Sequence, residues 1–96
     1  MKYILMAVLF GSLTLAPVPV ETFNNAGKLY DSGKYSEAIN AYKEIMRQHG
    51  NSAEVYYNLG NAYFKDKKIG YTILSYERAL RISPRDSDIN YNLNYA

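Results

Sequence analysis

Residues that could support catalysis are scarce in this sequence. The single histidine, His49, lies beside Gly50 at the expected end of a helix, where it interacts favourably with the helix dipole. No nucleophile, carboxylate pair or metal-binding spacing accompanies it, and the sequence has no glycine-rich phosphate loop. The absence of cysteine excludes disulfides, thiolate nucleophiles and cysteine-based zinc sites. We therefore expect neither an enzyme nor a cofactor-binding protein.

Tyrosine and asparagine are the residues that offer noncovalent binding chemistry. The 96 residues include 11 tyrosines and no tryptophan. Tyrosine combines an apolar ring with a polar hydroxyl group, which suits both helix interfaces and wet binding grooves. The formal net charge is only +2, so a concentrated basic surface for nucleic acid is not expected.

An aromatic residue followed by asparagine recurs at a fixed interval. The three pairs are Phe23-Asn24, Tyr57-Asn58 and Tyr91-Asn92, spaced by 34 residues (57 − 23 and 91 − 57). Tyr42 and Tyr76 are related by the same interval, and so are Ala26 and Gly60. A period of 34 residues is the length of one helix-turn-helix repeat. The small residues Ala26, Gly60 and Ala79 are expected where paired helices cross closely.

Apolar spacing predicts two helices in each repeat. Ala38, Tyr42 and Ile45 fall at positions i, i+4 and i+7, which places them on one face of a helix. Gly33 and Pro84 are residues that end helices. The five expected helices cover approximately residues 21–32, 35–49, 52–65, 70–82 and 87–96.

Two helix starts carry capping signals. Either Asn51 or Ser52 is expected to cap the third helix, and Glu54 lies three residues after Asn51, as in a capping box. Either Asp86 or Ser87 is expected to cap the fifth helix.

The N-terminal segment has the pattern of a secretory signal. Lys2 precedes a run of roughly 12 apolar residues, which matches a signal peptide and is shorter than the ~20 residues of a membrane-spanning helix. Residues 1–16 are therefore expected to be a signal peptide or a membrane anchor, followed by a proline-containing linker over residues 17–20. This pattern predicts an exported protein, either periplasmic or anchored facing the periplasm.

The sequence over residues 53–84 resembles the tetratricopeptide repeat (TPR). The segments AEVYYNLGNAYF and SYERALRISP match its consensus at Tyr56, Leu59, Gly60, Tyr63, Tyr76, Ala79 and Pro84. The first repeat matches less well, because Thr22, Asn25, Ala26 and Leu29 replace its usual residues. The resemblance implies an all-α helix-turn-helix solenoid over residues 21–96, preceded by the signal or anchor helix. Two repeats, about 21–52 and 53–86, would be followed by an extra helix over 87–96.

The wider arrangement resembles a narrower family, the N-terminal part of BatE-type proteins of Bacteroides aerotolerance operons. The resemblance rests on the signal segment, the run LYDSGKYSEAINAYKEIM and the run ILSYERALRISPRDSDINYNLNYA. It implies a cell-envelope protein in a membrane-associated complex with von Willebrand A-domain partners. Most such proteins continue into further C-terminal and membrane segments, so the alternative that the chain is a fragment of a longer membrane-anchored protein stays open.

The TPR resemblance also implies which residues line the concave face of the solenoid. Asparagine can bond to main-chain amides whatever the side chains are, and aromatic rings add apolar contact, so an extended peptide or a partner protein is the expected ligand. Lys65 is the only positively charged residue among these groove positions, so a clamp of several lysines on a terminal carboxylate is not expected. The candidate binding residues are Phe23, Asn24, Tyr30, Tyr57, Asn58, Asn61, Phe64, Lys65, Tyr91, Asn92 and Tyr95.

Two functions remain open at this point. The first is an adaptor that binds a partner in a groove centred on Tyr57, Asn58 and Asn61. The second is a structural unit that self-associates, because two and a half repeats are few for a continuous core. In that case the fifth helix would expose Ile89 and Leu93, with Tyr91 as a further candidate, to a second copy or to further repeats.

Overall fold

A computed structural model of the chain describes residues 18–96, which form five α-helices. The expected signal or anchor segment and Pro17 lie outside the described residues. The predicted all-α fold is confirmed, and each helix end lies within about one residue of its expected place. The helices are α2 (Val20–Asp31), α3 (Tyr35–His49), α4 (Ala53–Lys65), α5 (Ile69–Ile82) and α6 (Ser87–Tyr95).

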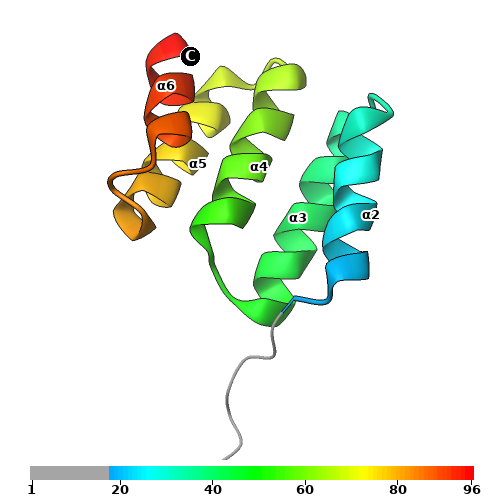
Figure 1. Cartoon of the computed structure of the whole chain (residues 1–96). Helices are drawn as coiled ribbons and strands as arrows, with labels where there is room; N and C mark the ends of the chain where they lie inside the picture. The colour runs from blue at the N-terminus through cyan, green and yellow to red at the C-terminus, as the bar shows by residue number, and fades with distance from the viewer. Residues whose placement is uncertain (1–17) are drawn as a thin grey trace, which may run out of the picture.

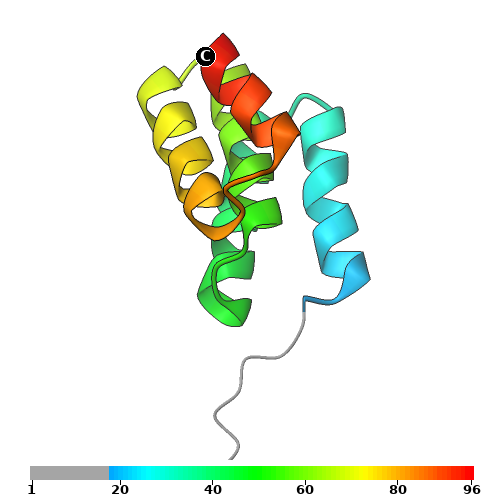
Figure 2. The same ribbon diagram turned by 60° about the vertical axis from the view of Figure 1, so that its left-hand side comes forward.

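The helices form two layers (Figure 1). Helices α2, α4 and α6 lie in one layer, while α3 and α5 lie behind them in the other. Figure 2 shows the same arrangement from another side, with α6 and α2 flanking α4. The principal contacts join each helix to the next one along the chain, as expected for stacked helix pairs. The first helix of each pair therefore faces a shared concave side.

The start of α2 differs slightly from the expected boundary. Pro19 occupies the position before the helix, and its carbonyl accepts the first helical hydrogen bond, from the Phe23 N–H at 3.2 Å. Val20 is therefore helical and not part of the linker. Proline is tolerated here because the first N–H groups of a helix have no partner within the helix.

Side-chain caps begin α4 and α6. The Ser52 hydroxyl accepts a hydrogen bond from the Val55 N–H at 3.1 Å, and a carboxylate oxygen of Asp86 accepts from the Ile89 N–H at 3.2 Å. The expected capping box between Asn51 and Glu54 is wrong. Because Ser52 is the cap, the third residue after it is Val55, whose side chain has no acceptor to complete the box.

Equivalent turns close the two helix pairs in different ways. Gly33 follows α2 with φ +76°, and Lys67, 34 residues later, follows α4 with φ +63°. Glycine adopts this left-handed conformation without steric cost, whereas lysine does not. The second turn therefore keeps the repeat geometry at the expense of local strain.

Small buried residues allow the helices to cross closely. Ala26, Ala38, Ala62 and Ala79 are almost completely buried, and Gly60 is buried as well. The expectation of close crossings at Ala26, Gly60 and Ala79 is confirmed. Around them, the larger side chains of the main core are Ile39, Tyr42, Ile45, Val55, Leu59 and Tyr63.

The face of α6 that was expected to be exposed is covered. Ile89 is 2% exposed and packs with Tyr76 and Ala79, while Leu93 is half-buried against the same cluster. The prediction that Ile89 and Leu93 await another helix is therefore wrong. These two residues lie one turn apart, so α6 turns both onto the helices before it. Tyr91, which lies between these two residues in the sequence, is 70% exposed.

An apolar surface is exposed on α5 instead. Ile69 is 40% exposed, Tyr71 58% and Leu74 38%, and together they border a shallow hollow beside Lys68. We call Ile69, Tyr71 and Leu74 the α5 apolar face. None of the helices in the described part of the chain is long and apolar enough to cross a membrane.

Candidate functional site

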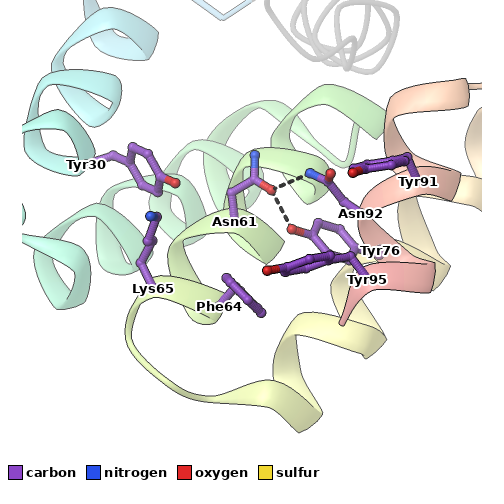
Figure 3. A pocket seen from close by; sticks show the side chains of 8 residues that line it. All are labelled: Tyr30, Asn61, Phe64, Lys65, Tyr76, Tyr91, Asn92 and Tyr95. Atoms are coloured by element: carbon purple, nitrogen blue, oxygen red, sulfur yellow. Dashed lines mark hydrogen bonds between the residues drawn. The ribbon is translucent and has the colours of Figure 1, made fainter.

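A cavity of about 350 Å³ opens on the concave side of the molecule. Its walls come from the ends of α2 and α4, from α6 and from one residue of α5. We call this cavity the central groove (Figure 3). Seven of its eight lining residues are among those expected from the sequence. The lining residues are Tyr30, Asn61, Phe64, Lys65, Tyr76, Tyr91, Asn92 and Tyr95.

A hydrogen-bonded network joins α4, α5 and α6 at one wall of the central groove. The side-chain oxygen of Asn61 accepts from the hydroxyl of Tyr76 and, at 3.2 Å, from the amide nitrogen of Asn92. The same Asn92 nitrogen also donates to the hydroxyl of Tyr57 at 3.0 Å. The network therefore fixes the orientation of both side-chain amides.

One polar atom of each amide remains available to a ligand. The Asn61 nitrogen is directed away from its two hydrogen bonds (Figure 3). Within residues 18–96 neither this nitrogen nor the Asn92 oxygen makes a side-chain hydrogen bond. Neither is a buried atom left without a partner, so both are accessible to solvent. The central groove thus presents one amide donor and one amide acceptor.

Tyr76 is the lining residue that the sequence reasoning missed. It comes from α5, the second helix of its repeat, whereas the expected residues all come from first helices. Its ring is only 3% exposed and lies against Gly60, which has no side chain to displace it. Burial raises the pKa of Tyr76 to about 12, so the phenol that binds Asn61 stays protonated at neutral pH. The signal that could have found it is Gly60, one residue before Asn61.

Aromatic rings form the apolar part of the central groove. Phe64 on α4 and Tyr95 on α6 meet edge to face, with ring centroids 6.0 Å apart. Tyr91 and Tyr95 are 70% and 74% exposed, so their rings offer apolar contact area that the fold itself does not cover. Such rings can bind an aliphatic or aromatic side chain while freezing few rotatable bonds.

Among the described residues, Lys65 is the only charged side chain that lines the central groove. It lies one helical turn after Asn61 on α4, and Figure 3 places it on the side nearest Tyr30. It is exposed, and the salt bridges of residues 18–96 do not include it. Burial raises the pKa of Tyr30, so this neighbouring phenol is neutral at physiological pH.

Four expected residues do not line the central groove. Phe23 and Asn24 border separate hollows along α2, and the Phe23 ring packs edge to face on Tyr42 with centroids 5.9 Å apart. Asn58 is half-buried outside the groove lining. Tyr57 does not line the groove but contacts two residues that do: its hydroxyl accepts a hydrogen bond from Asn92, and its ring packs on Tyr76.

The paired helices, the 34-residue period and the concave groove agree with comparisons to known families. A TPR repeat model matches residues 24–67, and a tetratricopeptide repeat model matches residues 53–86. This chain is a tetratricopeptide-repeat protein. Tetratricopeptide repeats generally mediate protein–protein interaction and are non-catalytic scaffolds. No curated protein matches the chain. Within residues 18–96 of this TPR protein, no cluster of His, Asp and Glu could hold a metal ion.

Proposed function

We propose that this TPR protein is an adaptor that binds an extended peptide segment of a partner protein in its central groove. The observation that carries the proposal is the network around Asn61 and Asn92. Two side-chain amides are held in fixed orientations, and each keeps one atom free for a ligand. A peptide group has one N–H and one carbonyl, so it complements this donor and acceptor pair irrespective of sequence.

Preorganisation strengthens this argument. A flexible asparagine loses rotational freedom when it binds, and this loss weakens binding. Asn61 and Asn92 are already held by the two tyrosine hydroxyls before a ligand arrives. The exposed rings of Tyr91 and Tyr95 add apolar contact beside them.

The proposal is tested by selecting peptides from a random 12-residue displayed library on the immobilised full-length chain. Asn61→Ala and Asn92→Ala are each expected to lower the affinity for the selected peptides by about tenfold or more, because a fixed polar contact is lost. Asn40→Ala on the exposed side of α3 is the matched control and should bind normally. Unchanged binding by both groove variants, with normal circular dichroism, would contradict the proposal.

Self-association through α5 is a second candidate. It is supported by the α5 apolar face, whose residues Ile69, Tyr71 and Leu74 are 40%, 58% and 38% exposed. Two such faces could pack against each other around a two-fold axis. Leu74→Glu should then convert a concentration-dependent dimer to a monomer in light scattering. A wild-type chain that is monomeric at all concentrations would rule this candidate out.

We also propose that the protein is exported and acts at the cell envelope. The support is the charged residue and apolar run of residues 1–16, which are typical of a signal peptide or anchor. The test is protease digestion of intact and permeabilised cells with an epitope tag at the C-terminus. Export predicts that the tag is cut once the outer barrier alone is opened, whereas protection until the inner membrane is lysed would contradict it.

A role in an aerotolerance-type complex rests only on the resemblance of the sequence to BatE-type proteins. On this proposal the partner would be a von Willebrand A-domain protein bound through the central groove. Co-purification of such a protein with the tagged chain, reduced by Asn92→Ala, would support it. Co-purification that is unaffected by the substitution would place the contact elsewhere and contradict this use of the groove.

A further inference from the structure

We propose that the central groove selects peptide segments in which an internal Asp or Glu lies within about two residues of an aliphatic or aromatic residue. In this arrangement Lys65 binds the carboxylate, and the Phe64 and Tyr95 rings bind the apolar side chain. The inference rests on the proposed peptide-binding function and adds the chemistry of the ligand.

Charge is the first argument. Lys65 is the only charged residue among the eight that line the central groove, and the salt bridges of the described residues leave it unpaired. The other polar groups beside it are phenols and amides, which are neutral at physiological pH. The groove lining therefore carries a single positive charge, and a carboxylate is the peptide group that complements it.

Spacing is the second argument. Lys65 follows Asn61 by four residues on α4, so the two side chains share one face about 6 Å apart along the helix. In an extended peptide, side chains on the same side repeat every two residues, a distance of about 6.6 Å. A peptide group bound at Asn61 therefore brings a side chain about two residues away to Lys65.

The rings supply the apolar half of the recognition. Phe64 follows Asn61 by less than one turn on α4, and its ring partner Tyr95, on α6, is 74% exposed. An apolar side chain covering these rings would also reduce the access of water to Lys65, which strengthens the attraction between lysine and carboxylate. A peptide that binds in this way therefore needs an acidic residue and an apolar residue close together in its sequence.

The geometry favours an internal carboxylate over a chain terminus. A separate hollow lies along α2, lined by Phe23, Asn24, Gly27, Lys28 and Asp31. Asp31 is the residue after Tyr30 of the central groove, so this hollow offers room for a peptide that extends past Lys65. One lysine provides a single point of attachment, which suits a side chain of a passing segment. The charges in that second hollow, Lys28 and Asp31, balance each other and add no further preference for an acid.

The test compares two random 12-residue libraries, one with a free C-terminus and one flanked by protein at both ends, on the full-length chain. We expect Asp and Glu to be enriched at least threefold within two residues of an apolar residue in both libraries. Enrichment only with the free C-terminus would mean terminal carboxylate binding and would overturn the inference. Lack of any acidic enrichment would overturn it as well.

Charge reversal provides the decisive variant. Lys65→Glu should remove the acidic enrichment and select Lys or Arg, while the apolar preference remains. Lys43→Glu, the same change on the exposed side of α3, is the matched control and should select like the wild type. Acidic enrichment that persists in Lys65→Glu would disprove the role of Lys65. If peptides bind through Asn61 and Asn92 without acidic enrichment, only this inference fails; if no peptide is selected, the proposed function fails with it.

Discussion

The ring of Tyr76 lies directly over Gly60. A β-carbon at Gly60 would come within 2.5 Å of Cε1 and 2.6 Å of Cδ1 of that ring. Because the Tyr76 hydroxyl also binds Asn61, this contact links the packing of α4 on α5 to the wall of the central groove.

Gly60→Ala should destabilise the domain by about 1–3 kcal/mol, although alanine favours helices by up to ~1 kcal/mol relative to glycine. The buried Tyr76 ring cannot move without breaking its hydrogen bond. Gly27→Ala is the matched control, since its β-carbon would meet only the Tyr42 hydroxyl at 3.9 Å. Urea unfolding checks both; a Gly60→Ala protein as stable as Gly27→Ala would contradict the close contact.

Lys67→Gly should stabilise the protein by about 0.5–1 kcal/mol. Lys67 has a φ of +63°, and glycine relieves the ~1–2 kcal/mol cost of a left-handed residue while adding some freedom to the unfolded chain. Lys67→Ala removes the same charge without this relief and serves as the control. Thermal unfolding should give a higher melting temperature for glycine than for alanine. The reverse order would show that the turn is not strained.

Stability should fall between pH 10 and pH 12 because of Tyr76. Its pKa is about 12 in the folded protein, against 10.0 for an ordinary tyrosine. The raised pKa stabilises the folded state fully below pH 10, and this contribution is lost as pH rises through 12. Tyr76→Phe should show a shallower loss in urea unfolding at pH 9–12. Equal slopes in both proteins would contradict the assignment to Tyr76.

Asp86→Ala should destabilise α6 by about 1 kcal/mol, because the cap for the Asp88 and Ile89 N–H groups is removed. Asp88→Ala removes the same charge without removing a side-chain cap and is the control. Hydrogen exchange of α6 amides should become faster in the first variant than in the second. Peptide binding in the central groove should weaken as well, since Asn92 lies on α6.

The helices could be predicted from the sequence because the apolar residues and the turns both recur with the same 34-residue period. The resemblance to the TPR family, and not the register alone, implied that Asn61, Phe64 and Lys65 face the groove, and all three line it. Tyr91, Asn92 and Tyr95, which the same resemblance implied, line the cavity beside them, and their role in binding stays a prediction.

The remaining features depend on contacts between helices, which a repeat register does not contain. Tyr76 enters the groove only because Gly60 leaves space for its ring. Ile89 and Leu93 are covered because α6 is short and closes onto the preceding pair. The TPR resemblance implies that Phe23 faces the groove, but its ring packs on Tyr42 beside the α2 hollows.

The central groove takes Tyr30 from the first described helix and Tyr95 from the last. In a stack where each helix mainly holds its neighbour, the terminal helix is the first to fray. A ligand that contacts both Tyr30 and Tyr95 would connect the first and the last described helix directly and would stabilise α6 in its packed position. Opening of α6 would then require release of the ligand, so occupancy of the groove would be visible as slower hydrogen exchange at the C-terminal end of the chain.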